Sequence, residues 1–318
     1  MNTKNSIGIY IHIPYCILKC PYCDFNSYTV GKEKNAFPEE AYTKSLLSEL
    51  TFQLNNPAWQ ERECHSVFFG GGTPSLFSPA SIDSLISAIK RNFRLTTDAE
   101  ITLEANPGTL QEELIVEKLA GFREAGVNRI SMGAQSFNPE KLKFLGRIHS
   151  PEESLNAVKN IKASGFKNFN LDLIYAVNNE SREEWESDLR QAIALEPNHI
   201  SAYCLTIEPG TEFGKKHKKG LLKVLDEEVQ AKMYEQTLKT LEVNSYYQYE
   251  VSNFSKTSHQ CRHNLTYWNW SDYLGLGAGA HSFLKSYNNS NILAKRWSNI
   301  PGPNDYIQRA NEIGNCQQ

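Results

Sequence analysis

Short apolar runs alternate with longer amphipathic stretches along most of the chain. Six such runs are bounded by glycine, proline or polar residues, at positions 8–13, 66–69, 100–104, 129–134, 168–174 and 199–205. Short runs of this kind are typical of buried parallel strands. The amphipathic stretches between and after them predict helices over residues 39–54, 80–92, 110–125, 151–164, 181–195 and 226–243.

Strands that alternate with helices predict an α/β fold with right-handed βαβ units. Six units indicate a partial (β/α)6 TIM-like barrel or an open curved sheet, with the site at the carboxyl ends of the strands. After residue 243 the pattern changes, because residues 245–270 are aromatic and polar and residues 273–282 are rich in glycine. We therefore expect a barrel over residues 1–243 and a smaller region over 244–318 that covers the site and is not a seventh repeat.

Composition narrows the class of protein. Of 318 residues, 40% are hydrophobic and 22% charged, which is ordinary for a soluble globular protein. The net charge of −3 gives no basic footprint for nucleic acid. No run approaches the ~20 apolar residues of a membrane span, and residues 1–7 do not form a signal peptide. We expect a cytoplasmic protein without a transmembrane segment.

Three of the seven cysteines stand close together, directly after the first predicted strand. Cys16-Ile-Leu-Lys-Cys20-Pro-Tyr-Cys23 has the spacing C-x3-C-x2-C, which favours a metal site over disulfides. Three thiolates can hold three irons of a [4Fe–4S] cluster and leave the fourth iron open to a small molecule. The alternative is a structural zinc ion with His12 as the fourth ligand. The isolated Cys64, Cys204 and Cys316 are interpreted as structural thiols.

Glycines and polar residues follow the predicted strands. Phe69-Gly-Gly-Gly-Thr-Pro74 forms a turn in which glycines let the backbone approach a ligand closely. Glu104 and Gln135 end or follow two further strands, with Arg147 nearby. Asp172 lies within an otherwise apolar strand, where a carboxylate is costly unless it is hydrogen bonded. A barrel would bring these strand ends together.

These motifs resemble the radical S-adenosylmethionine superfamily. In that superfamily the methionine amine and carboxylate chelate the open iron, and reduction of the cluster yields a 5′-deoxyadenosyl radical. The resemblance implies contacts with S-adenosylmethionine from Tyr10, Gly71, Gly72, Thr73, Glu104, Gln135, Arg147 and Asp172. The most similar branch contains oxygen-independent coproporphyrinogen III dehydrogenase and the heme chaperone HemW. Its matching runs include Tyr10-Ile-His-Ile-Pro-Tyr-Cys16, Glu104-Ala-Asn-Pro-Gly108, Gly133-Ala-Gln-Ser-Phe137, Leu145-Gly-Arg-Ile-His149 and Thr206-Ile-Glu-Pro-Gly210.

Two features separate the two members of this branch. The dehydrogenase has a fourth cysteine at the position of Phe25, and an extension ahead of its cysteines where this chain has fifteen residues. His263-Asn-Leu-Thr-Tyr-Trp268 matches the H-N-x-x-Y-W motif associated with heme binding in HemW. The resemblance therefore implies heme contacts from His263, Asn264, Tyr267 and Trp268, with an imidazole for iron and aromatic faces for the porphyrin. Cys261 and His281 are further candidate ligands.

The sequence departs from this family twice. Ala176-Val-Asn-Asn179 replaces the usual Gly-Leu-Pro turn after the Asp172 strand, and the small domain formed by the family's last sixty or so residues is expected to be absent. The resulting hypothesis is a heme chaperone, with radical decarboxylation of coproporphyrinogen III as the alternative and no assigned catalytic residue. The implied partners are heme, heme-accepting proteins such as respiratory cytochromes, and an electron donor such as flavodoxin or ferredoxin. Peripheral contact with a membrane and a cluster-dependent homodimer are compatible with this hypothesis.

Overall fold

A computed structural model describes residues 6–31, 37–110, 114–285 and 293–318. The six predicted strands are β1 (Ser6–Ile13), β4 (Glu63–Gly71), β5 (Arg94–Ala105), β6 (Arg129–Gln135), β7 (Phe169–Tyr175) and β8 (His199–Cys204). They lie side by side in this order and are all parallel. The predicted parallel α/β arrangement is therefore confirmed.

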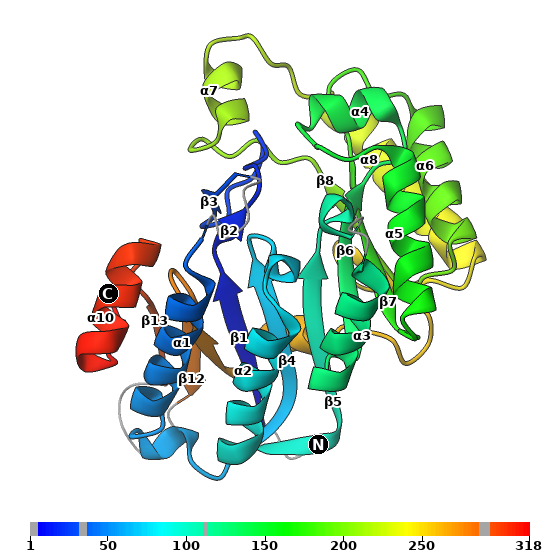
Figure 1. Ribbon diagram of the computed structural model, residues 1–318. Helices are drawn as coiled ribbons and strands as arrows, with labels where there is room; N and C mark the ends of the chain where they lie inside the picture. Colours follow the sequence, from blue (N-terminus) through cyan, green and yellow to red (C-terminus); the bar gives the residue numbers. More distant parts are fainter. Residues whose placement is uncertain (1–5, 32–36, 111–113, 286–292) are drawn as a thin grey trace.

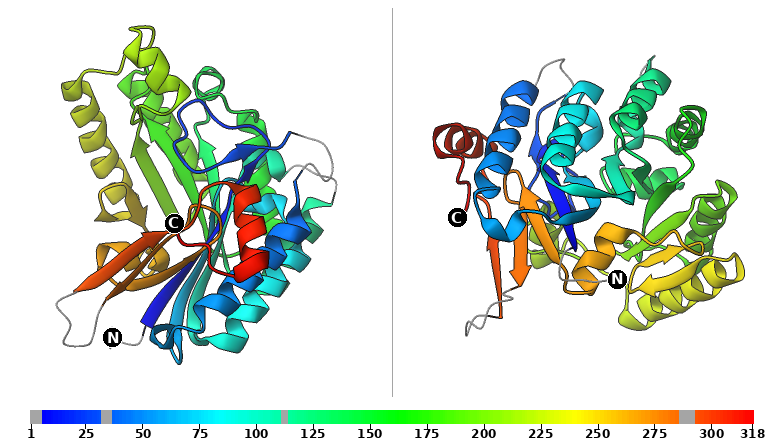
Figure 2. Two further views of the ribbon diagram at one scale, coloured as in Figure 1. Left: turned by 90° about the vertical axis from the view of Figure 1, so that its left-hand side faces the viewer. Right: turned by 90° about the horizontal axis from the view of Figure 1, so that it is seen from below.

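The six predicted helices are also present. They are α1 (Glu39–Gln53), α2 (Pro79–Asn92), α3 (Ile115–Ala125), α5 (Pro151–Ala163), α6 (Arg182–Ala194) and α8 (Glu227–Val243). Positions 111–113 of the third predicted helix lie outside the described residues. The helices cover the outer face of the curved sheet (Figures 1 and 2). Helices α5 and α6 each begin with a capping box, formed by Ser150 with Glu153 and by Ser181 with Glu184.

Side chains alternate between the two faces of the barrel strands. In β1, Ile9 and Ile11 are fully buried in the core beneath the helices, whereas Tyr10 lines the inside of the barrel. In β7, Leu171 belongs to the same core and Asp172 lines the inside. Successive side chains of a strand point to opposite faces, so one strand supplies both the core and the site.

Strands from residues 244–318 extend the same sheet at both edges. Beside β1 lies the parallel strand β11 (Asp272–Leu276), followed by the antiparallel strands β12 (His281–Lys285) and β13 (Ala294–Ser298). Beside β8 lie β10 (Asn253–Ser255) and β9 (Tyr247–Glu250). The two predicted regions thus share one sheet, and the division at residue 243 stays a prediction.

Short elements complete the described residues. They are β2 (Tyr15–Cys16), β3 (Tyr28–Thr29), α4 (Pro139–Phe144), α7 (Glu212–Lys218), α9 (Arg262–Trp268), α10 (Pro303–Ile313) and the 3-10 turns Pro57–Trp59, Pro74–Leu76 and Pro107–Thr109. None of the helices within the described ranges is long and apolar enough to cross a membrane.

Glu49 of α1 joins α10 to the glycine-rich turn after β11. Tyr306 and Asn299 each donate a hydrogen bond of 2.6 Å to its carboxylate, and the backbone amide of Gly277 donates a third of 2.9 Å. Burial raises the pKa of Glu49 to about 7, although these hydrogen bonds oppose the shift. One carboxylate therefore ties three distant parts of the chain together.

Candidate functional site

The three clustered cysteines lie past the carboxyl end of β1, with Cys16 ending β2 and with Cys20 and Cys23 on the loop between β2 and β3. Cys16, Cys20 and Cys23 are all free thiols and half-buried. Pairing of β2 with β3 closes the base of this loop, and the Cys23 amide donates to the Cys20 carbonyl at 3.1 Å. The spacing read from the sequence therefore corresponds to one compact loop.

Each thiol has a polar neighbour. Thr73 Oγ1 donates to Cys16 Sγ at 3.5 Å, and an Arg147 guanidinium nitrogen donates to Cys20 Sγ at 3.4 Å. The Ser27 hydroxyl lies 4.0 Å from Cys23 Sγ. Hydrogen bonds to sulfur stabilise thiolates and tune the potential of a cluster that they hold. Two of these neighbours come from other parts of the chain, so the fold arranges them around the loop.

His12 is not available as a fourth ligand in this arrangement. Its Nδ1 is hydrogen bonded to the Tyr10 hydroxyl at 2.9 Å and its Nε2 to the Asn26 carbonyl at 2.8 Å. Burial lowers the pKa of His12. Across the described parts of the chain, no three histidine, cysteine, aspartate or glutamate side chains are placed to hold a single metal ion.

The glycine run packs against the strand that leads into the cysteine loop. A Cβ on Gly71 would lie 2.4 Å from the His12 ring, and one on Gly72 would lie 2.6 Å from the Tyr15 carbonyl oxygen. Gly71 also has a φ of 111°, which favours glycine. Only glycine fits at these two positions. Because the glycine backbone lies so close to the strand, the turn lies beside the cysteines.

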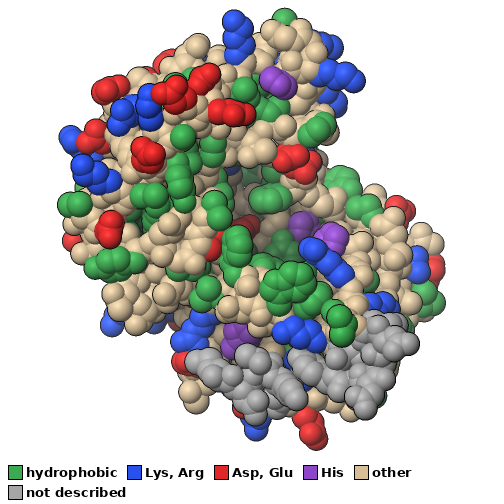
Figure 3. Space-filling model, turned by 180° about the vertical axis from the view of Figure 1, so that it is seen from behind, with side chains coloured by type: hydrophobic (Ala, Val, Ile, Leu, Met, Phe, Trp, Pro, Cys, Tyr) green, Lys and Arg blue, Asp and Glu red, His purple; other side chains and the backbone are tan. Residues whose placement is uncertain are grey.

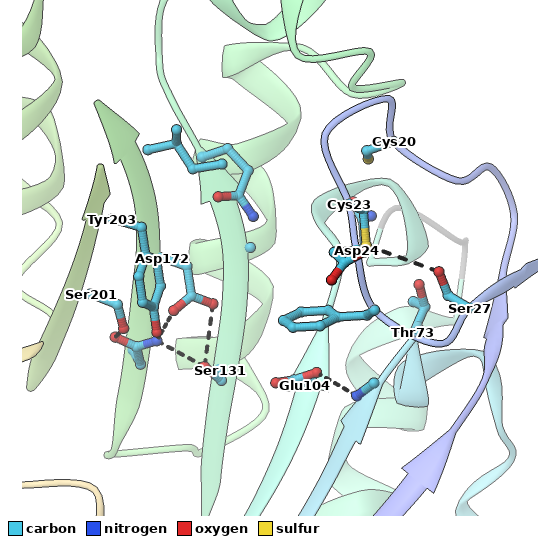
Figure 4. A pocket seen from close by; sticks show the side chains of 18 of the residues that line it. Cys20, Cys23, Asp24, Ser27, Thr73, Glu104, Ser131, Asp172, Ser201 and Tyr203 are labelled. Carbon is cyan, nitrogen blue, oxygen red and sulfur yellow. Dashed lines mark hydrogen bonds between the residues drawn. The ribbon is translucent and has the colours of Figure 1, made fainter. Parts of the chain in front are cut away.

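Two carboxylates face the inside of the barrel. Glu104 accepts a hydrogen bond of 3.0 Å from the Gly71 amide (Figure 4). Asp172, which is partly buried, accepts one of 2.7 Å from Asn170. Burial, with the charge of Asp172 as a second cause, raises the pKa of Glu104 to about 8, and burial raises the pKa of Asp172.

A cavity of about 610 Å³ brings these groups together. From behind, the surface is hollowed near its middle, and hydrophobic side chains gather around the hollow (Figure 3). We call the 610 Å³ cavity the cluster cavity. Its lining includes the predicted residues Tyr10, Cys16, Cys20, Cys23, Gly71, Gly72, Thr73, Glu104, Gln135, Arg147, Asp172, His263, Asn264 and Tyr267. Trp268 and the candidate ligand His281 do not line it.

Further polar side chains of the cluster cavity were not predicted. Those on β6, β7 and β8 are Arg129, Ser131, Asn170, His199, Ser201 and Tyr203. Figure 4 shows Ser131, Ser201 and Tyr203 beside Asp172, across the cavity from the cysteines. The signal was present in the sequence, because polar residues alternate with apolar ones along these strands.

Comparison with known proteins places this chain in a family. Residues 10–192 match the radical SAM superfamily. The chain is 47% identical to the heme chaperone HemW of Haemophilus influenzae over 280 residues, which is 87% of this chain and 70% of that protein. It is 46% identical to HemW of Escherichia coli over 277 residues, covering 86% of this chain and 69% of that protein.

The chain belongs to the HemW family of the radical SAM superfamily. Its fold is also similar to the solved structure of coproporphyrinogen III oxidase (HemN) from Escherichia coli, with a TM-score of 0.79 over 99% of this chain and 71% of that one. The identity to that enzyme is 22%, so this likeness concerns the fold alone.

Radical SAM membership implies a [4Fe–4S] cluster and S-adenosylmethionine, and the cluster cavity fits both groups. Three thiols face one cavity, which is the ligand set that the cluster needs. Within the described residues, Arg147 Nε and Asn106 Oδ1 are buried at the cavity wall without a hydrogen-bond partner. Buried polar atoms are rarely left unpaired, so a donor and an acceptor here suit a polar ligand.

The H-N-x-x-Y-W motif of the HemW family forms helix α9. His263 is buried, with its Nδ1 hydrogen bonded to Ser66 at 3.1 Å and its Nε2 to Tyr267 at 2.8 Å. Burial lowers its pKa to about 3. Trp268 ends the helix, is 52% exposed and does not line the cluster cavity. Cys261 is buried, and its thiol donates to Glu100 at 3.4 Å.

A second cavity of about 700 Å³ adjoins the cluster cavity. Its walls carry the rings of Phe25, Tyr267, Trp270, Tyr273 and Phe283, so we call it the aromatic cavity. His281 and Arg296 are its polar groups from β12 and β13. Partial burial, with the charge of Arg296 as a second cause, lowers the pKa of His281.

Proposed function

We propose that this protein is a heme chaperone that holds a [4Fe–4S] cluster and S-adenosylmethionine, binds heme and passes it to acceptor proteins. The observation that carries the proposal is the 47% identity to the HemW heme chaperone of Haemophilus influenzae over 87% of the chain. Phe25, where the dehydrogenase has a cysteine, agrees with it.

The cysteine loop would hold the cluster through Cys16, Cys20 and Cys23. When bound, the cluster supplies an open iron and one-electron chemistry. Tyr10, Gly71, Gly72, Thr73, Glu104, Gln135, Arg147 and Asp172 are the residues proposed to contact S-adenosylmethionine. The amides of Gly72 and Thr73 already donate to the carbonyls of Ile13 and Tyr15, so this turn would offer acceptors rather than donors to an ammonium group.

Heme would lie near helix α9, whose His263, Asn264, Tyr267 and Trp268 form the family motif. The proposed acceptors are heme proteins such as respiratory cytochromes, and the proposed electron donor is of the flavodoxin or ferredoxin type. A cytoplasmic location, peripheral contact with a membrane and a cluster-dependent homodimer belong to the same proposal.

The test is anaerobic reconstitution with iron, sulfide and hemin, followed by iron, sulfide and heme analysis and a visible spectrum. The proposal expects one cluster and bound heme in the same protein, and transfer of that heme to an apo-cytochrome. Protein that carries a cluster but neither retains heme nor transfers it would contradict the proposal.

A parallel incubation addresses the enzymatic alternative. The reconstituted protein is mixed with coproporphyrinogen III, S-adenosylmethionine and reductant without oxygen. Repeated formation of protoporphyrinogen IX would replace the chaperone proposal with radical decarboxylation. No product, together with retained heme, supports the chaperone.

A further inference from the structure

The aromatic cavity shares a wall with the cluster cavity. Tyr10, Asp24, Phe25 and Tyr267 line both cavities. Phe25 comes from the cysteine loop and is 64% exposed, and Tyr267 comes from helix α9 and is 42% exposed. A ligand in the aromatic cavity would therefore lie next to the cluster loop without entering the space that holds S-adenosylmethionine.

One face of strands β11, β12 and β13 forms the opposite wall. Phe283 pairs with Tyr273 of β11 and with Arg296 of β13, and His281 lies two residues before Phe283 on the same face. The rings of Tyr273 and Phe283 stack with centroids 6.1 Å apart. This wall presents two aromatic rings, an imidazole and a guanidinium together.

Exposed rings complete the cavity. Trp270 is 72% exposed, and its ring stands at 77° to that of Phe283 with centroids 6.1 Å apart. Tyr267 meets Tyr273 edge-on at 4.8 Å. Exposed aromatic side chains that adjoin one another commonly indicate a binding site, whereas single exposed ones do not. A volume of about 700 Å³ lies within the roughly 300–1,000 Å³ of small-molecule sites.

His281 differs from every other histidine of the chain in one respect. His12, His65, His149, His199, His217, His259 and His263 each make at least one side-chain hydrogen bond. His281 makes none within the described ranges, and its side chain lines the aromatic cavity. A neutral imidazole with free nitrogens is a metal ligand that needs no rearrangement.

Arg296 supplies a positive charge that could bind a carboxylate. Among the described residues it forms no ion pair with a carboxylate. Burial raises the pKa of the Tyr273 hydroxyl, and the nearby Arg296 charge opposes that rise. Guanidinium groups bind carboxylates through paired hydrogen bonds. The cavity therefore offers an imidazole for iron, flat apolar walls for a porphyrin ring and a guanidinium for a propionate. These three groups match the three chemical parts of heme.

We propose that heme lies in the aromatic cavity with His281 as its axial ligand and a propionate on Arg296. This inference rests on the proposed heme-chaperone function and deepens it. The lone pair of one imidazole nitrogen forms the bond to iron, so no oxidant, reductant or proton acceptor is required. His263 then acts as a positioning residue, because both of its nitrogens are engaged and one of them holds the Tyr267 wall.

The test compares His281→Ala with His263→Gln and with His259→Ala, whose histidine lines neither cavity. Each cluster-loaded protein is mixed with hemin, reduced, and examined by resonance Raman for the iron–histidine stretching band. The wild type, His259→Ala and His263→Gln are expected to show the band. His281→Ala is expected to lose it and to regain it when free imidazole is added.

Metal-free protoporphyrin IX separates the ligand bond from the rest of the site. Its binding, followed by fluorescence, is expected to persist in His281→Ala and to weaken in Arg296→Ala. An unchanged band in His281→Ala, or loss of the band in His263→Gln alone, would overturn the assignment while leaving the chaperone proposal intact. A wild-type protein that binds neither hemin nor protoporphyrin would instead overturn the proposed function itself.

Discussion

The two adjoining cavities differ in the hydrogen bonding and the exposure of the side chains that line them. In the cluster cavity the inward-facing polar side chains are bonded to the protein itself, since the buried His263 uses both of its nitrogens and Asp172 accepts from Asn170. In the aromatic cavity Phe25, Tyr267 and Trp270 are exposed, and His281 makes no hydrogen bond with the described residues. This difference suits the two kinds of ligand that we propose. A resident cofactor needs fixed partners, whereas a heme that is to be transferred must enter and leave.

The largest expected effect comes from removing one cysteine of the loop. Cys23→Ala is expected to lose the cluster altogether, because a cubane held by two thiolates lacks a required ligand. Iron and sulfide analysis with the visible spectrum measures this. Cys204→Ser is the matched control, since Cys204 lines the same cavity outside the loop. If the cavities act separately, Cys23→Ala still binds protoporphyrin, and loss of that binding would break the comparison.

The next effect is a pH dependence of the ligand-free protein. The pKa of Glu104 is raised from 4.5 to about 8 in the folded state. Between these values the folded protein keeps a proton that the unfolded chain releases. The free energy of unfolding therefore falls as the pH rises, by up to about 1.4 kcal/mol per pH unit.

Glu104→Gln is expected to flatten that part of the pH profile, measured by urea unfolding between pH 5 and pH 8. Glu235→Gln, at an exposed position of α8, is the control and is expected to leave the slope unchanged. An equal slope in Glu104→Gln and the wild type would mean that burial of this carboxylate does not govern the cluster cavity.

A smaller effect is expected at the wall between the two cavities. Tyr267→Phe removes the hydroxyl that is bonded to His263 and is expected to lower the free energy of unfolding by about 1 kcal/mol. Tyr234→Phe breaks an exposed bond with Gln248 and should cost less. Chemical denaturation measures both, and the reverse order would argue that the wall does not depend on His263.

The smallest effect is expected at two exposed tryptophans, Trp268 at the end of α9 and Trp270 two residues later. Trp270→Ala is expected to weaken porphyrin binding by about 1 kcal/mol, since an aromatic contact contributes roughly 0.5–1.5 kcal/mol. Trp268→Ala, outside both cavities, is expected to change neither binding nor stability. Protoporphyrin fluorescence titration measures both variants. Equal losses of affinity would contradict the prediction that Trp270 contacts the porphyrin and Trp268 does not.

Local patterns were enough to predict the barrel and the cysteine loop. The six apolar runs became six parallel neighbours because each run is bounded by turns and followed by an amphipathic helix. The loop was predictable because Cys16, Cys20 and Cys23 lie close in sequence and need no distant partner. The polar lining of the strands could have been found as well, from the alternation that places Asp172 opposite the core face.

Long-range placement was not predictable in the same way. Strand β11 pairs with β1 although more than 250 positions separate them, and β11 in turn pairs with β12, which carries His281; no local signal gives these pairings. The motif likewise named Trp268, but the helix turns its last residue away from the cavities. Ala176 could not be interpreted from the sequence for a different reason. Its φ of 63° is a conformation that favours glycine, which is the usual residue of the family's turn, and the backbone adopts it here with alanine.

The pairing of β2 with β3 has a consequence for the life of the cluster. Because this small sheet and the Asn26 side chain, bonded to the carbonyls of Ala278 and Pro301, already fix the loop, the entropy of closing it is lost during folding. Loading iron and sulfide then requires no further ordering of the chain. A cluster proposed for this loop would, after destruction by oxygen, be reassembled on a backbone that is already folded.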